Sequence, residues 1–384
     1  MSYILSLASW YPNRTDAFIG DFVERHVHSI SKFRKVIVLH ITKDENKTNE
    51  NDEIEINKED ENLVVYNVYY KKKFSGNAEK ILSSFKYFRL QKKIVNKIIK
   101  KYGKPELVHL HIAMKAGLMA IFIKKKYGIP YVITENWTGY YRQSSTNIFN
   151  SGWLFKFLIK QVFVQANLLL AVTKDLGVTI NSNLIKIPFS VIPNVVDTNH
   201  FYYKPQINKQ KFEFIHISSM NHNKNAEGIL RAVKLLSEEE MNFIIVMIGS
   251  INKNLISLAE QLSVKDFIVF KNEIPYSEVA QKMQSASAFI LFSIAENLPC
   301  VILEALCCGL PIISSDVGGI WEVVNQSNGI LVESGNEYEL KEAMKKMITN
   351  YNYYNRKEIA NQAAGKFNYS VIGKQFDTIY KKIR

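Results

Sequence analysis

The sequence predicts an α/β protein with two Rossmann-like domains, each a doubly wound parallel sheet. Three observations predict it. Short apolar runs alternate with longer segments of helical periodicity almost from end to end, which is typical of parallel sheets covered by helices. The alternation stops once, at the polar and aperiodic stretch 197–210, and then restarts. At 384 residues, the chain also exceeds the size of one ordinary core.

The apolar runs place the strands, and the 3.6-residue periodicity places the helices. The expected strands are Ser2–Ala8, Val36–Ile41, Leu63–Tyr70, Leu107–His111, Tyr131–Thr134, Leu168–Val172, Ser190–Ile192, Phe212–Ile217, Phe243–Ile248, Phe267–Phe270, Ala288–Phe292, Pro311–Ser314 and Gly329–Val332. Helices are expected at 17–32, 79–101, 114–127, 153–166 and 371–383. The acidic segment 44–61 is interpreted as a solvated loop. Because ligands of such sheets bind at the carboxyl ends of the strands, two facing domains predict a cleft between those ends.

The net charge of +13 is concentrated in the first half of the chain. Residues 71–126 hold 16 Lys and Arg against two acidic residues, Glu79 and Glu106. The segment 79–101 is amphipathic, which favours an anionic membrane surface as a peripheral partner. The alternative is that these lysines only solvate helix surfaces. No recognised nucleic-acid motif is present, so we expect no nucleic-acid partner.

The three cysteines all lie between Cys300 and Cys308. An odd number without a disulfide framework favours a reducing, cytoplasmic environment. No histidine or further cysteine stands at ligand spacing, so no metal site is expected there. The N-terminal residues are interpreted as a first strand and not as a signal peptide, and no apolar run is long enough to span a membrane.

The stretch AENLPCVILEALCCGLPIISSDVGG, residues 295–319, carries two glutamates eight residues apart. Asn297 suits an N-cap, and Gly309 suits the position after a helix, so Glu296 should lie outside a helix N-terminus and Glu304 inside the helix. A helix N-terminus and the small residues Gly318 and Gly319 favour phosphate, while carboxylates accept hydrogen bonds from hydroxyls. A nucleotide sugar has both kinds of group. The alternative is that Glu296 only caps the helix and Glu304 pairs with a surface lysine.

The whole string resembles the donor-site signature of the retaining glycosyltransferases of the family 4 type, glycosyl transferases group 1. The matching residues are Ser293, Glu296, Glu304-Ala305, Gly309, Pro311, Gly318-Gly319 and Glu322. The resemblance implies the GT-B fold, with a last helix that crosses back to the first domain. It therefore implies an acceptor domain at 1–198, a donor domain at 199–366 and a returning helix at 367–384. It also implies that Glu296 contacts the donor sugar and that Glu304 holds the ribose, with Asn297, Leu298, Gly318 and Gly319 beside them.

Other stretches carry the same resemblance. Residues 191–197, VIPNVVD, are similar to the family's interdomain motif. In the loop that contains Lys224, which the family uses to grip the donor diphosphate, Ser219 stands where the family has arginine. The loss removes a bidentate phosphate ligand. Gly20 corresponds to a glycine near the donor phosphates. His109, His111, Glu135 and Asn136 correspond to the strand ends on the acceptor side, with Asn136 in the place of a common histidine.

The resemblance implies transfer of a sugar from a nucleotide diphosphate, UDP favoured over GDP, to an acceptor hydroxyl with retained anomeric configuration. We expect Glu296, Lys224 and His111 to be the catalytic residues, although a structural role for His109 and His111 is an equal alternative. The acceptor would be a saccharide or a lipid-linked saccharide in cell-surface polysaccharide synthesis. No Asp-x-Asp motif stands in a donor-loop context, so neither a metal nor a cofactor is expected. The rival functions are a sugar-nucleotide epimerase of the same fold and a non-catalytic protein that binds nucleotide sugars or membranes.

Overall fold

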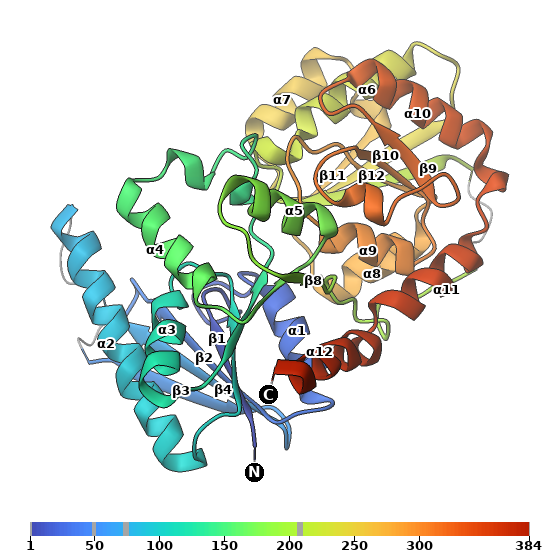
Figure 1. Cartoon of the computed structure of the whole chain (residues 1–384). Coiled ribbons are helices and arrows are strands. Elements are labelled where there is room, and N and C mark those ends of the chain that lie inside the picture. The colour runs from blue at the N-terminus through green and yellow to red at the C-terminus, as the bar shows by residue number, and fades with distance from the viewer. Residues whose placement is uncertain (1, 48–50, 72–76, 206–209, 384) are drawn as a thin grey trace.

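The computed structural model describes residues 2–47, 51–71, 77–205 and 210–383, and it contains two sheets covered by helices (Figure 1). The first sheet has eight strands in the order β3-β4-β2-β1-β5-β6-β7-β8, and the second has six in the order β11-β10-β9-β12-β13-β14. All strand pairs are parallel except β3 with β4. The predicted fold of two parallel α/β domains is confirmed.

The first sheet and its helices occupy most of the first half of the chain. Its strands are β1 (Ile4–Ala8), β2 (Val36–Lys43), β3 (Glu53–Lys58), β4 (Leu63–Tyr70), β5 (Leu107–His111), β6 (Tyr131–Glu135), β7 (Leu168–Ala171) and β8 (Phe189–Val191). Its helices are α1 (Asp21–Ser31), α2 (Asn77–Tyr102), α3 (Gly117–Tyr127), α4 (Trp153–Val164) and α5 (Lys174–Asn183).

The second sheet begins after the interdomain crossing. Its strands are β9 (Phe212–Ser218), β10 (Phe243–Gly249), β11 (Ile268–Lys271), β12 (Ala288–Leu291), β13 (Ile312–Ser315) and β14 (Gly329–Val332). Its helices are α6 (Ala226–Ser237), α7 (Lys253–Gln261), α8 (Tyr276–Ser285), α9 (Cys300–Cys307), α10 (Glu337–Thr349) and α11 (Arg356–Phe367), and α12 (Tyr369–Ile383) follows. Part of the expected linker, residues 206–209, lies outside the described residues.

The expectation of a solvated loop at 44–61 is wrong in its second half. Strand β3 pairs antiparallel with β4 and forms the edge of the first sheet. Ile54 and Ile56 alternate with charged residues, and Ile54 packs against the core while Ile56 is exposed. An edge strand with one solvated face tolerates such charges, and charges there also discourage pairing with other chains.

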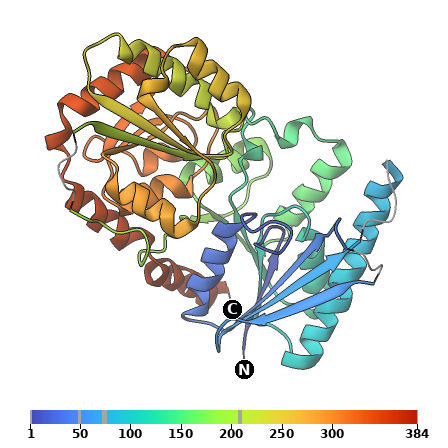
Figure 2. The same cartoon turned by 180° about the vertical axis from the view of Figure 1, so that it is seen from behind.

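Helices cover both faces of the first sheet (Figures 1 and 2). α2, α3 and α4 lie together on one face, and α1 packs with α12 on the other. Val95 and Ile98 of α2 are fully buried in the core of the domain. Most of the apolar face that made 79–101 look like a membrane-binding helix is therefore covered by its own sheet.

α12 returns to the first domain, as the resemblance implied. Its residues Phe376 and Tyr380 are buried in the same cluster as Val27 and Ile30 of α1. The Arg34 guanidinium pairs with the carboxylate of Asp377 on α12. The C-terminus consequently lies beside the first domain (Figure 1).

Candidate active site

The Glu296 loop leaves the carboxyl end of β12 and leads into α9. The helix begins at Cys300 with Pro299 as its N-cap residue, and no side chain caps it. The expectation that Asn297 is the N-cap is therefore wrong, because two further residues separate it from the helix. Gly309 follows the helix with φ 74°, the left-handed conformation that favours glycine, which confirms its predicted position.

Two groups of the second domain bind the same carboxylate oxygen of Glu296. Its Oε1 accepts a hydrogen bond from Ser293 Oγ at 2.9 Å and forms an ion pair with Lys224 Nζ. A backbone bond from Ile294 to the carbonyl of Asn223, 2.7 Å, ties the Glu296 loop to the Lys224 loop. Glu296 is 6 % exposed. The structure thus brings together the carboxylate and the cation that the sequence predicted for one donor.

Glu304 is held by two groups from different parts of the chain. Its Oε1 accepts from Arg25 Nη1 at 2.6 Å and from the Tyr276 hydroxyl at 2.9 Å. Arg25 lies on α1 of the first domain, and its guanidinium also lies 4.9 Å from the ring centroid of Tyr276. Glu304 is 2 % exposed, so the alternative of a surface Glu304–Lys pair is excluded.

Sequence reasoning missed Arg25 and Tyr276. The available signal was an arginine inside a helix with a strong apolar face, four residues after Asp21. Asp21 accepts from Arg25 Nη2 at 2.6 Å. The contact with Glu304 joins residues 279 positions apart, and no local pattern indicates it.

The turn at Gly318 and Gly319 serves close packing between chain segments. Gly318 has φ 56°, and a Cβ at this position would overlap the carbonyl of Glu296. A Cβ on Gly319 would overlap the side chain of Thr173, which belongs to the first domain. The Gly319 N–H donates to the Asn297 carbonyl at 3.1 Å. The expectation that this amide is open to a phosphate is therefore wrong in this structure.

A set of amide and hydroxyl groups joins the two domains beside Glu296. Thr173 Oγ1 donates to Asn297 Oδ1 at 2.9 Å, and Asn136 Nδ2 donates to Asn194 Oδ1 at 3.2 Å. Asn194 Nδ2 in turn donates to the Leu298 carbonyl at 2.7 Å. Asn136 thus lies at the junction of the two domains.

Glu322, which matched the family signature, also acts across the domains. Its two carboxylate oxygens accept from the backbone N–H groups of Lys174 and Asp175, at 2.9 and 2.8 Å. These amides form the first turn of α5. A carboxylate at a helix N-terminus is favoured by the unpaired amides and the helix dipole.

His109 and His111 lie side by side in the interior of the first domain. Their ring centroids are 3.9 Å apart, and His26 of α1 stacks on His111 at 6.2 Å. His109 bonds to Thr134 Oγ1 and to the Tyr380 hydroxyl, each at 2.6 Å. Burial holds the pKa of both His109 and His111 well below the usual range.

The prediction that His111 contacts an acceptor is wrong for this structure. His111 is 1 % exposed, and neither of its ring nitrogens has a hydrogen-bond partner among the described residues. Strand alternation places it at the carboxyl end of β5, paired with Ala8 and Thr134, but it points to the face covered by α1 and α12. The rings of His26 and His109 shield it there.

Glu135 ends β6 at the same edge of the sheet. Burial raises its pKa to about 7, although Ala113 N–H and the Tyr140 hydroxyl donate to its Oε2 at 3.0 and 2.9 Å. The N–H groups of Asn136 and Trp137 donate to its Oε1. Glu135 is fully buried, so it organises the loops of this edge and does not face an acceptor.

The remaining predicted donor residues lie near the loops that open each domain. Gly20 precedes α1 in a left-handed conformation and packs against the backbone of Trp10. Ser219 is exposed, and its Oγ accepts from Asn221 Nδ2 at 2.9 Å. A serine hydroxyl in this place leaves Lys224 as the cation next to Glu296.

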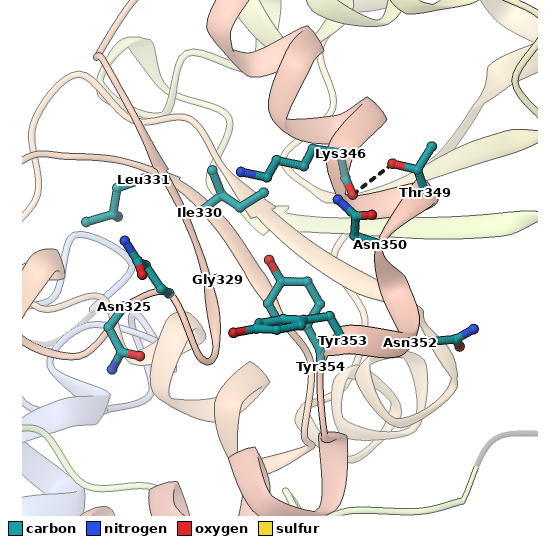
Figure 3. A pocket seen from close by; sticks show the side chains of 11 residues that line it. Asn325, Gly329, Ile330, Leu331, Lys346, Thr349, Asn350, Asn352, Tyr353 and Tyr354 are labelled. Carbon is teal, nitrogen blue, oxygen red and sulfur yellow. Dashed lines mark hydrogen bonds between the residues drawn. The ribbon is translucent and has the colours of Figure 1, made fainter.

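Two other features lie away from these residues. A cavity of about 880 Å³ opens beside β14, lined by residues such as Asn325, Lys346 and Tyr354, and it holds none of the predicted site residues (Figure 3). Glu24, His28 and Glu59 place ligand atoms within 4.8 Å of one another at the edge of α1. Both features are separate from the two glutamates.

The chain is similar to known proteins in its sequence and in its fold. The model of glycosyl transferases group 1 matches residues 199–365, and that of glycosyltransferase family 4 matches residues 52–200. A Bacillus subtilis glycosyltransferase named for teichuronic acid biosynthesis is 23 % identical, over 97 % of this chain and 94 % of its own. Sucrose-phosphate synthase from Thermosynechococcus elongatus has a TM-score of 0.78 at 15 % identity, with 99 % of both chains covered. An Anabaena protein solved in complex with UDP has a TM-score of 0.71 at 15 % identity, covering 99 % of this chain and 100 % of its own.

Proposed function

Because the chain belongs to the glycosyl transferases group 1 and has the two-domain fold of such enzymes, we propose that it transfers a sugar from a nucleoside diphosphate to an acceptor hydroxyl, with retention at the anomeric carbon. One observation carries the proposal. Two buried carboxylates, Glu296 and Glu304, stand beside two cations, Lys224 and Arg25, at the junction of the domains.

The donor is assigned to these groups by their chemistry. Both Lys224 and Ser293 engage Oε1 of Glu296, and both Arg25 and Tyr276 engage Oε1 of Glu304. We assign Oε2 of Glu304 to the ribose hydroxyls and Oε2 of Glu296 to the transferred sugar. Lys224 then lies next to the diphosphate. The UDP complex of a protein with the same fold supports uridine as the base, and a guanosine donor is the alternative.

The reaction needs charge stabilisation more than a protein nucleophile. Retaining glycosidases use a carboxylate nucleophile, with the two carboxyl groups about 5 Å apart. Here each glutamate is already bound by a cation, which favours a binding role. We propose that the bond from the anomeric carbon to the diphosphate breaks while the acceptor oxygen approaches from the same face. The leaving phosphate oxygen takes the acceptor proton, and Lys224 neutralises the charge that develops on the diphosphate.

The location of the acceptor is inferred from the charge of the first domain. The segment 71–126 carries 16 basic and two acidic residues, and Arg89, Lys93 and Lys97 are exposed on α2. We propose that the protein acts in the cytoplasm at an anionic membrane surface, on a saccharide or lipid-linked saccharide. The similarity to a protein named for teichuronic acid biosynthesis supports a polysaccharide role. Among the described residues, no helix has the length and apolar content needed to cross a bilayer.

A panel of UDP- and GDP-sugars tests the donor. A ligand that binds only the folded protein raises its melting temperature, so one nucleotide should stand out. Donor consumption is then followed with and without saccharide acceptors. A new glycosidic product supports the transferase, an altered sugar nucleotide without acceptor supports an epimerase, and a thermal shift without turnover supports a binding protein.

Two isosteric variants test the two glutamates separately. Glu304→Gln should weaken binding of the free nucleotide about tenfold or more, because a hydrogen bond to a charged group is worth about 1.5–3 kcal/mol. Glu296→Gln should leave binding of the nucleoside diphosphate intact and lower kcat. Equal nucleotide affinity in Glu304→Gln and the parent would contradict the ribose assignment.

A further inference from the structure

Helix α4 is apolar on the face it buries and also on the face it presents to solvent. Its inner residues Ile159, Val162 and Phe163 are buried against the domain. On the outer face, Trp153 is 79 % exposed and Phe157 is 51 % exposed. A helix that is apolar all round is normally buried in a core or a membrane. The composition of α4 therefore predicts that its outer face is covered, but in this structure that face is exposed to solvent.

The exposed apolar side chains of two neighbouring helices extend this surface. On α2, Leu82 is 48 % and Phe85 is 67 % exposed, and on α3, which lies between α2 and α4, Leu118 is 38 % exposed. Each of these helices follows a parallel strand, so its N-terminal half lies at the carboxyl edge of the sheet (Figures 1 and 2). We call this surface the apolar edge; it consists of Leu82, Phe85, Leu118, Trp153, Leu154 and Phe157.

The charges around the apolar edge are mostly of one sign. Lys160 is exposed on α4, and Arg89 and Lys93 are exposed on α2. No Asp or Glu occurs from residue 136 to residue 174. One acidic partner, Asp52, pairs with Lys86 at 3.2 Å. In a symmetric dimer through this surface, the same lysines and arginines would face one another, which is unfavourable. An anionic bilayer offers both the negative charge and the apolar layer.

We propose that the apolar edge inserts into the headgroup region of an anionic lipid bilayer, with α4 as its principal anchor. Trp153 and Phe157 would enter the headgroup–acyl boundary, where an amphipathic aromatic ring is favoured, while Lys160, Arg89 and Lys93 bind lipid phosphates. The purpose of membrane binding rests on the proposed function. In that function an acceptor approaches the carboxyl edge of the sheet, so insertion would bring lipid-linked saccharides to it.

Vesicle binding tests the proposal without any enzymatic assay. The parent should sediment with vesicles of phosphatidylglycerol and phosphatidylcholine at low salt and bind pure phosphatidylcholine far less. The Trp153→Ser/Phe157→Ser variant should bind at least tenfold more weakly, since two side chains lose their transfer into an apolar layer. The matched control is Tyr338→Ser/Tyr353→Ser, which removes two aromatic side chains, 63 % and 74 % exposed, from the second domain and should bind as the parent does.

A second measurement excludes misfolding and the competing occupant. Far-UV circular dichroism and urea unfolding should show that Trp153→Ser/Phe157→Ser folds, because the removed side chains are exposed. Light scattering should give a monomer for the parent at the concentrations used. A parent dimer that dissociates in this variant would overturn the proposal, because the surface would then bind a second copy of the chain. Equal vesicle binding by the variant and the parent would also overturn it. Donor turnover with a saccharide acceptor free in solution should not change, so failure here is distinct from failure of the proposed transferase.

Discussion

At the residue scale, the ion pair of Arg25 and Glu304 joins the first domain to the second. The two side chains come from different domains and are both buried, 7 % and 2 % exposed. Removing one partner of a buried pair leaves the other charge without compensation, which costs more than removing both. Arg25 retains Asp21 and the Val195 carbonyl as further acceptors, which limits the cost on its side.

We therefore predict that Glu304→Ala lowers the free energy of unfolding by about 3 kcal/mol, and that adding Arg25→Met restores part of the loss. The measurement is urea unfolding of the two single variants and the double variant. Additive effects would show that the pair is not coupled. This cycle also separates loss of stability from the loss of nucleotide affinity expected for Glu304→Gln.

At the element scale, the packing of β5 against α1 and α12 depends on neutral histidines. Burial lowers the pKa of His26 to about 4 and holds those of His109 and His111 well below their usual range. Burial also lowers the pKa values of His40 and His216 to about 4. All five are less readily protonated in the folded than in the unfolded protein, whose histidines titrate near pH 6.5.

The direction in which pH changes the free energy of unfolding follows from the protons that the folded and unfolded states bind. Between about pH 6.5 and 4, the unfolded chain binds more protons than the folded one, so stability falls as the pH falls. Glu135 acts in the opposite direction, because its raised pKa of about 7 favours the folded state at low pH and this contribution is lost as the pH rises from about 4.5 to 7. The pKa values of Glu24, which burial raises, and of His28, which Glu59 raises, act in the same direction as that of Glu135. The five buried histidines outnumber these three groups. We predict a steep decrease in the free energy of unfolding below pH 6.5.

Urea unfolding at a series of pH values measures this decrease. Each buried histidine contributes up to about 1.4 kcal/mol per pH unit in its range. His111→Phe should reduce the slope by about that amount. A flat profile between pH 6.5 and 5 would contradict the buried, neutral state of these rings.

Two helical glycines give a matched test of how tightly α12 packs. A Cβ on Gly373 would overlap the carbonyl of Ser29 on α1, whereas a Cβ on Gly365 in α11 meets nothing within 4 Å. We predict that Gly373→Ala destabilises the protein by about 1–3 kcal/mol through overpacking. Gly365→Ala should stabilise it by about 0.5–1 kcal/mol, because alanine is the better helix former. Thermal unfolding compares the two, and equal effects would refute the close contact.

At the scale of the whole molecule, the domains meet through many short polar contacts and one tight backbone approach. Gly319 packs on Thr173 of the other domain, next to the bond from Thr173 to Asn297. We predict that Gly319→Ala holds the domains apart. Solution scattering should give a larger radius of gyration for this variant, and kcat should fall more than nucleotide affinity. Gly365→Ala is the control for a neutral glycine substitution, and an unchanged radius of gyration in Gly319→Ala would contradict the prediction.

Much of this architecture is encoded locally. Apolar runs in the sequence predicted every described strand except β3, because a buried parallel strand requires a continuous apolar segment. The stretch 295–319 correctly predicted Glu296 outside a helix, Glu304 within it and Gly309 just after it, because these positions depend on neighbouring residues alone. The sequence also contains the alternating pattern of the edge strand β3, in which Ile54 and Ile56 are separated by a charged residue. The acidic composition of the segment led to the prediction of a loop instead.

The other features of the site and the surface depend on contacts between residues that are distant in the chain. The sequence by itself determined which carboxylates and cations are candidates for a donor site, but only the tertiary structure paired Glu304 with Arg25 and buried His111 beneath His26. It also bonded the Gly319 amide to the Asn297 carbonyl and buried Val95 and Ile98 of α2 against the sheet, while the outer face of α4 stayed exposed. The physical reason is that periodicity shows which face of an element is apolar, whereas what covers that face depends on segments that are distant in the chain.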